Sequence, residues 1–304
     1  MRSEMHDRLQ FAGIMEPDEQ EEAKKQSQFL EVLKRLTRSK TAMIGLIIFI
    51  ILVIIAIIGP MIAPYDYAEM VVSEKNQLPS AVHILGTDDV GRDILSRLLV
   101  GTRYTLLLGL GACVVGLIIG IILGCVAGFF GGWVEEVIMR LCDVMQAIPG
   151  MLLAVAISSA LGNGLVFTII ALSIGRIPFV CRMLRAQFLN QRKLEYVEAA
   201  QAENCSKATI MFKHILPNTI SPLIVATTMG VGNTITMAAS LSYIGLGVQP
   251  PTPEWGAMLS AAKGYIRHYP YQLLFPGLAI AILVLAMNLF GDGLRDAMDP
   301  KLKN

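Results

Sequence analysis

Charged residues are scarce in this chain of 304 residues. They make up 16% of it, against 54% hydrophobic residues, and the mean hydropathy is +0.58. Soluble domains usually carry about 25% charged residues. A surface this poor in charge needs lipid around it, so the composition predicts an integral membrane protein. The net charge of +1 gives no indication of a nucleic-acid partner.

Signatures of catalysis and metal binding are missing as well. The chain contains no HExxH or GxSxG motif, which argues against an intramembrane enzyme, and no Gly-Lys dipeptide, which excludes a Walker A loop. Its five cysteines form no CxxC pair, and most lie in or beside apolar runs, as small buried hydrophobic residues do. Its four histidines are far apart in sequence. We therefore expect no metal site and no bound cofactor in this chain.

What the chain does have is six apolar stretches, and a helix needs about 20 residues to cross a bilayer. The third and fourth stretches are the least apolar, because Arg140 and Asp143 stand at the start of one and Arg176 lies inside the other. A charge at membrane depth must reach the membrane surface or find a partner. The fold class predicted is an all-α integral membrane protein with six transmembrane helices, at roughly 42–63, 105–130, 139–161, 165–180, 220–246 and 273–290.

Three segments outside these stretches also have a recognisable character. Residues 1–28 are rich in acids and poor in large apolar residues, which predicts a mobile cytoplasmic tail. In 29–41, apolar residues recur at helical spacing with basic residues between them, which predicts an amphipathic helix on an anionic membrane surface. In 64–104, Ile94 and Leu98 indicate a helix lying at the outer interface before the second span.

The distribution of lysine and arginine predicts the orientation. Eight precede the first span, six lie in 182–213 and three follow the last span. On the other side, 64–104 holds four and 247–272 holds two. These counts predict that both termini and the segment 182–213 face the cytoplasm.

Two spans have distinctive side chains. The second carries glycine at every fourth position, which predicts a face for close helix packing; the partner helix could belong to this chain or to another. The fifth is rich in hydroxyl and amide groups, which predicts a helix lining a pathway, with helix-to-helix hydrogen bonds as the alternative. The packing residues are Gly116, Gly120, Gly124 and Gly128, and the candidate pathway residues are Thr228, Asn233, Thr236 and Ser240.

A polar island, "LEYVEAAQAENCSKATIMFKHILPN" at 194–218, separates the fourth and fifth spans. Good helix formers fill its first half. Asn204 is the expected break, because asparagine tolerates left-handed backbone, and Ser206 can cap a second helix. Pro217 is expected to end that helix. The island therefore predicts a helix-turn-helix suited to docking on another protein, with a merely solvated loop as the alternative.

The island resembles the EAA loop of permease subunits of ATP-binding-cassette importers, which couples the permease to its ATPases. Here the loop would occupy 190–218, and Asn204 stands where that family has glycine. The residues to which the resemblance assigns coupling are Glu198, Ala199, Ala200, Glu203, Asn204, Ile215, Leu216 and Pro217.

Other stretches, such as "LGTDDVGRDILSRLLVGTRYT" and "LSYIGLGVQPPTPEWGAML", resemble the dipeptide, oligopeptide and nickel permease group. Within it the chain is most similar to the DppC/OppC type. Arg176 departs from the apolar or aromatic residue expected at its place. The resemblance implies that 42–304 form a type I importer transmembrane domain in a bacterial or archaeal cytoplasmic membrane.

The resemblance also implies partners and a cargo. The full transporter would add a second homologous permease (DppB/OppB type), two cytoplasmic ATPases (DppD/DppF type) that bind ATP and Mg, and an extracytoplasmic solute-binding protein. Its cargo would be di- or oligopeptides; nickel, a metal chelate, glutathione or an opine remain alternatives. A self-energised secondary transporter or channel is a further alternative, but it would need several buried acids, and only Asp143 lies near a span.

Overall fold

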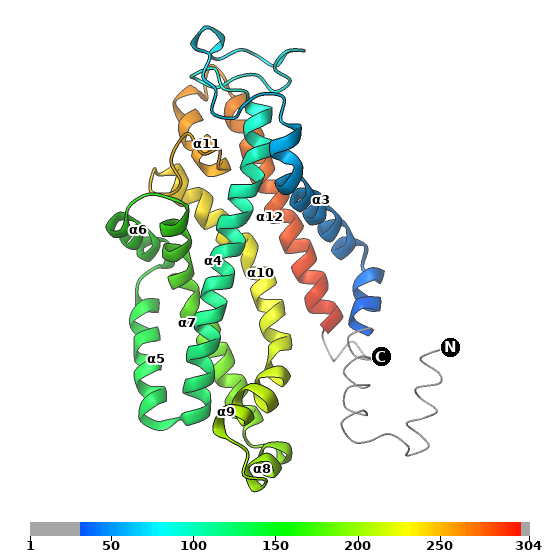
Figure 1. Ribbon diagram of the computed structural model, residues 1–304, viewed down its shortest axis with the longest axis vertical. Helices are drawn as coiled ribbons and strands as arrows, with labels where there is room; N and C mark the ends of the chain where they lie inside the picture. The colour runs from blue at the N-terminus through cyan, green and yellow to red at the C-terminus, as the bar shows by residue number, and fades with distance from the viewer. Residues whose placement is uncertain (1–30, 299–304) are drawn as a thin grey trace.

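A computed structural model describes residues 31–298, and within this range the chain is helical with no named strand (Figure 1). Residues 31–38 are helical and precede α3. The predicted tail 1–28 and the first two residues of the predicted helix 29–41 lie outside the described residues. The main elements are α3 (Lys40–Ile62), α4 (Ile94–Phe130), α5 (Gly132–Ala147), α6 (Gly150–Leu161), α7 (Leu165–Gln191), α8 (Glu195–Ala202), α9 (Lys207–Thr209), η2 (Ile210–Ile215, a π-helix), α10 (Leu216–Tyr243), α11 (Trp255–Ala262) and α12 (Tyr271–Met298). Two short 3₁₀ turns complete the list, η1 (Val72–Glu74) and η3 (Lys263–Tyr265).

The described chain has five helices long and apolar enough to cross a membrane, and a sixth span if α5 and α6 are taken together. This confirms the all-α membrane class. The span predicted at 139–161 is not one straight helix, however, because α5 and α6 meet at 93°. The cause is Pro149, since a proline disfavours helical backbone at the residue before it. Ile148 is accordingly extended, with φ −95° and ψ 128°.

Two other boundaries differ from the prediction. The short helix expected near Ile94 and Leu98 is the first part of α4, whose N-terminus is capped by Asp93 accepting a hydrogen bond from Ser96 N at 2.7 Å. Pro217 does not end the second island helix either, because the chain stays helical from Lys207 through to Tyr243. The wide π-turn before Pro217, in which Leu216 N–H donates to Met211 O, lets the helix continue past a residue that has no N–H to donate.

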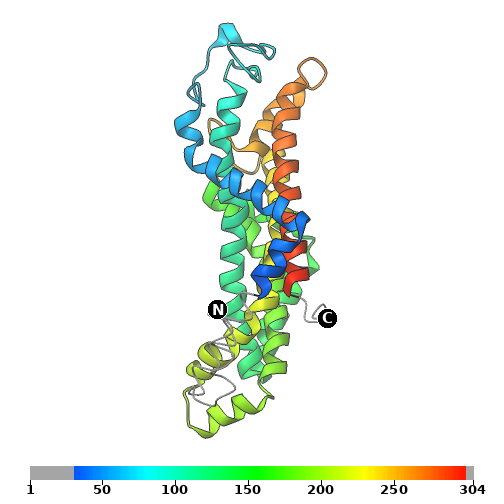
Figure 2. The same cartoon turned by 90° about the vertical axis from the view of Figure 1, so that its right-hand side faces the viewer.

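Close helix pairs hold the bundle together. The α4–α7 interface is the most extensive, followed by the pairing of α3 with α12; Figure 2 shows the first part of α3 (dark blue) against the end of α12 (red). At the α3–α12 interface, a Cβ added to Gly45 would lie 2.6 Å from Ala286 O. The backbones of these two helices are therefore as close as those of membrane helices that pack through small residues. The outward side chains of α3 are large and apolar; Met61 is 84% exposed. Lipid is the environment that suits them.

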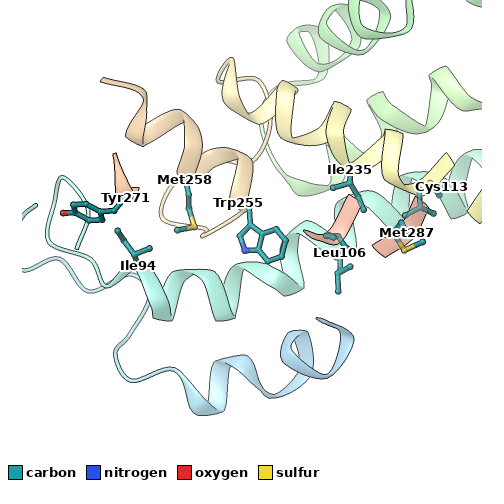
Figure 3. Close-up of a cluster of buried hydrophobic side chains, with 10 residues drawn as sticks. Ile94, Leu106, Cys113, Ile235, Trp255, Met258, Tyr271 and Met287 are labelled. Atoms are coloured by element: carbon teal, nitrogen blue, oxygen red, sulfur yellow. The ribbon is translucent and has the colours of Figure 1, made fainter. Parts of the chain in front are cut away.

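The largest buried cluster ties α4 to α10, α11 and α12 around Trp255 (Figure 3). Trp255 is 2% exposed, and its Nε1–H donates to Leu98 O at 3.1 Å. At this end of the molecule, Tyr271 O–H also donates to Gln77 O at 2.7 Å, which joins the long segment before α4 to α12. Figure 1 shows that this end lies opposite α8. The polar island therefore lies at the opposite tip of the bundle from this cluster.

Candidate functional site

The first island helix, α8, packs on a cluster of buried apolar side chains, which we call its seat. Val197 and Ala200 are 0% and 5% exposed, and they pack in a cluster with Leu184 and Phe188 of α7 and with Ile215. Cys125, Ile210 and Met211 complete this cluster. A short helix of eight residues is not stable by itself in water. Its attachment to the cluster is what fixes its position relative to α4 and α7.

The opposite face of α8 is open. Glu198 and Ala199 are exposed, and so are Ala202 and Glu203. The Glu-Ala-Ala triplet is therefore divided, with Ala200 turned into the chain and the first two residues turned outward. Small side chains between two acids leave a low surface that the groove of another protein can approach closely.

The turn after α8 is built by Asn204, whose φ of +59° is the left-handed conformation expected for it. Cys205 N–H donates to Ala200 O at 3.1 Å and Asn204 N–H to Gln201 O at 3.0 Å. This pair of bonds is the Schellman motif, in which glycine is the commonest residue at the left-handed position. Ser206 then caps α9 by accepting from Thr209 N at 3.1 Å.

The end of the island is anchored rather than free. Ile215 is fully buried in the cluster beneath α8, Leu216 packs against that cluster, and Pro217 is exposed at the start of α10. The predicted coupling residues thus fall into two groups. Ala200, Ile215 and Leu216 hold α8 in place, while the other five, Glu198, Ala199, Glu203, Asn204 and Pro217, are exposed.

The glycine stripe of α4 faces α7 of the same chain. Gly116, Gly120, Gly124 and Gly128 are all buried, and an added Cβ at any of them would come within 3.0 Å of α7 atoms. At Gly128 the nearest atom is Phe188 Cβ, at 2.5 Å. Because Phe188 also belongs to the seat of α8, the α4–α7 interface and the island form one continuous packed unit.

Two ion pairs link α5 to α7. Glu135 binds Arg185, and Asp143 binds Arg182. Asp143 therefore does not meet Arg176, which instead uses Nη1 to donate to Gly230 O and Thr234 Oγ1, each at 3.1 Å.

The four candidate pathway residues of α10 differ in their contacts. Thr228, Thr236 and Ser240 each donate a hydroxyl hydrogen bond to a carbonyl of their own helix. Asn233 is exposed and lines a cavity of about 550 Å³. The rest of its lining is Arg176 and Phe179 of α7, Ala226, Met229 and Gly230 of α10, and Asn288 and Asp292 of α12.

Asn288 and Asp292 are the polar residues that the sequence analysis missed. The signal was present, because an amide and an acid four residues apart lie on one face of a helix. The predicted sixth span stopped at residue 290, between the two, and so the pair was divided.

Comparison with known proteins assigns the class. Residues 93–304 match the family model described as "Binding-protein-dependent transport system inner membrane component". Residues 27–79 match the N-terminal transmembrane domain of oligopeptide transport permease C. The chain belongs to the first family, whose members are permease subunits of ATP-binding-cassette importers and not enzymes. It is accordingly a multi-pass inner-membrane component of such an importer.

Particular relatives place it within this class. It is 42% identical over 278 residues to the dipeptide transport system permease protein DppC of Alkalihalophilus pseudofirmus, covering 91% of each chain. It is 45% identical over 274 residues to the glutathione transport system permease protein GsiD of Escherichia coli, covering 90% of each. The family models and these relatives support the DppC/OppC type.

A solved structure shows the same fold. The chain aligns with a structure of the MetNI methionine ABC transporter in an inward-facing conformation, with a TM-score of 0.53 and 21% identity. The alignment covers 66% of this chain and 96% of that one. This likeness supports the type I importer architecture.

Proposed function

We propose that this chain forms half of the translocation pathway of an importer for di- or oligopeptides, driven by separate ATPase subunits. The observation that carries the coupling role is the divided surface of α8: Ala200 is packed inward, while Glu198 and Ala199 face outward. A helix seated on the α4–α7 unit transmits a push from outside to the membrane-spanning helices, because packed interiors are rigid.

The proposed assembly contains a second homologous permease, two ATPases that bind ATP and Mg, and an extracytoplasmic solute-binding protein. In this arrangement α8 faces the cytoplasm, as do both termini. The excess of lysine and arginine around the island supports that orientation. The chain itself carries no bound cofactor, and purified alone it should show no ATPase activity above background.

Glutathione is the second candidate cargo, because the GsiD relative is 45% identical to this chain, slightly more than the DppC relative. Glutathione is itself a small peptide with free carboxylates, so both candidates demand a similar pathway. The ligand carried by the solute-binding protein, identified by mass spectrometry of that protein as isolated, distinguishes the two.

The test of coupling uses the whole transporter in vesicles with its binding protein. Glu198→Arg and Ala199→Arg place a bulky cation on the outward face without touching the packed seat. We expect both to abolish most ATP-driven peptide uptake while the two permeases still purify together. Glu136→Arg reverses another exposed acid, on α5, and serves as the matched control. Uptake by Glu198→Arg equal to that of the control would show that α8 does not couple.

A further inference from the structure

Arg176 carries its positive charge inside α7, one of the five long membrane-spanning helices. Its guanidinium is held against α10 by the two bonds from Nη1 to Gly230 O and Thr234 Oγ1. Gly230 leaves the space for it, since a Cβ there would lie 2.4 Å from Arg176 Nη2. The side chain is thus built into the protein, against α10.

The charge of Arg176 has no counter-ion among residues 31–298. The ion pairs of α7 in this range involve Arg182 and Arg185, and both oxygens that Arg176 contacts are neutral. Its buried Nε also has no hydrogen-bond partner there. Charged residues at membrane depth are costly, and those that are retained there typically mark a pathway for a substrate or an ion.

The cavity beside Arg176 also has a negatively charged side chain, Asp292, in its lining. It lies among α7, α10 and α12, with α10 between the other two (Figure 1). Asp292 lines it but does not pair with Arg176, and the amides of Asn233 and Asn288 line it as well. A cation and an anion held apart, with neutral donors and acceptors on the same wall, suit a zwitterion. The volume of about 550 Å³ is within the range of small-ligand pockets.

We propose that this cavity is a transit site for the peptide cargo, in which Arg176 binds the C-terminal carboxylate and Asp292 binds the N-terminal ammonium. A planar guanidinium matches a carboxylate with two parallel N–H···O bonds, which a lysine cannot reproduce. Asn233 and Asn288 are placed to bond the peptide group. A peptide is expected here only if the chain serves a peptide importer, as proposed above.

The experiment measures binding to the purified full transporter without its solute-binding protein, so that recognition by that protein does not contribute. The probes are alanyl-alanine, its C-terminal amide and its N-acetyl derivative, each titrated while thermal unfolding is followed. We expect alanyl-alanine to stabilise the transporter and the amide to bind about 10- to 100-fold more weakly, as the loss of a charge-assisted hydrogen bond implies. Arg176→Met should remove the difference between these two probes, Arg176→Lys should retain part of it, and Asp292→Asn should remove the difference between alanyl-alanine and its N-acetyl derivative.

The control is Arg103→Met, which removes an exposed arginine of α4 that lines a different cavity. It should preserve the preference for the free carboxylate. Equal binding of alanyl-alanine and its amide by the wild type overturns the proposal, as does an Arg176→Met transporter that still prefers the carboxylate. If Arg176→Met instead separates the two permeases, Arg176 pairs with an acid of the second permease and the proposal also fails. None of these results changes the uptake defects expected for the α8 variants, so a failure of this site can be told apart from a failure of the coupling role.

Discussion

Substitution Gly124→Ala tests whether the close contact between α4 and α7 holds the bundle together. A Cβ at this position would lie 2.7 Å from Cys181 O and 2.9 Å from Leu184 Cβ. The first of these is backbone, which cannot rotate away, so α4 and α7 would have to separate by roughly half an ångström or more to restore ordinary contact. Overpacking of this kind costs about 1–3 kcal/mol.

The same substitution also brings a benefit, because alanine favours helix over glycine by about 0.5–1 kcal/mol. The balance is a net loss of about 1 kcal/mol, within a range of about 0–2.5 kcal/mol, and 1 kcal/mol is about a 5-fold change in the unfolding equilibrium. Unfolding of the purified chain by titration with sodium dodecyl sulfate, followed by circular dichroism, measures it. Gly175→Ala is the control, since a Cβ there meets nothing within 4 Å. Equal stability of the two variants would refute the view that this interface is sterically limiting.

The remaining predictions concern a turn, a buried acid and the seat of α8. Asn204→Gly should preserve ATP-driven uptake because glycine accepts the left-handed φ of +59°, whereas Asn204→Val should lower stability by about 1–2 kcal/mol and reduce uptake. Burial raises the pKa of Glu254, which caps α11 by accepting from Gly256 N and Ala257 N at 2.9 and 2.8 Å. The folded chain then holds the proton of the Glu254 carboxyl group more tightly than the unfolded chain does. The stability of the wild type should therefore fall as pH rises from the ordinary glutamate pKa through the raised one. Thermal melts of Glu254→Gln, measured over the same pH range, should not show that fall. Val197→Asp should detach α8 from its seat and abolish uptake, whereas Glu195→Gln, at an exposed position of the same helix, should leave it intact.

Local signals in the sequence predicted local features well. Asn204 and Ser206 have the backbone and side-chain properties that a left-handed turn and a helix cap require, and they adopt those roles. The long apolar runs likewise correspond to long helices. Hydropathy reports only how apolar a stretch is, however, and not the direction of its axis, so it could not show the 93° bend between α5 and α6.

Features that depend on which helices pair were beyond the sequence. The glycine stripe indicated close packing but could not identify α7 as its partner. The helix near Ile94 and Leu98 was predicted, but its continuity with the second span as one helix, α4, was not. Within that first part of α4, Arg97 is buried and donates to Tyr67 O at 2.9 Å. The cavity beside Arg176 combines residues of α7, α10 and α12, and the sequence does not show that these three helices meet.

The central claim is that the outward face of α8 touches an ATPase subunit. A photo-reactive amino acid at position 199, in the assembled transporter in membranes, tests this contact directly, with position 72 at the opposite end of the molecule as the control. We predict that light links position 199 to an ATPase subunit and that position 72 gives no such product. A transporter active in uptake that shows no link from position 199 would contradict the account.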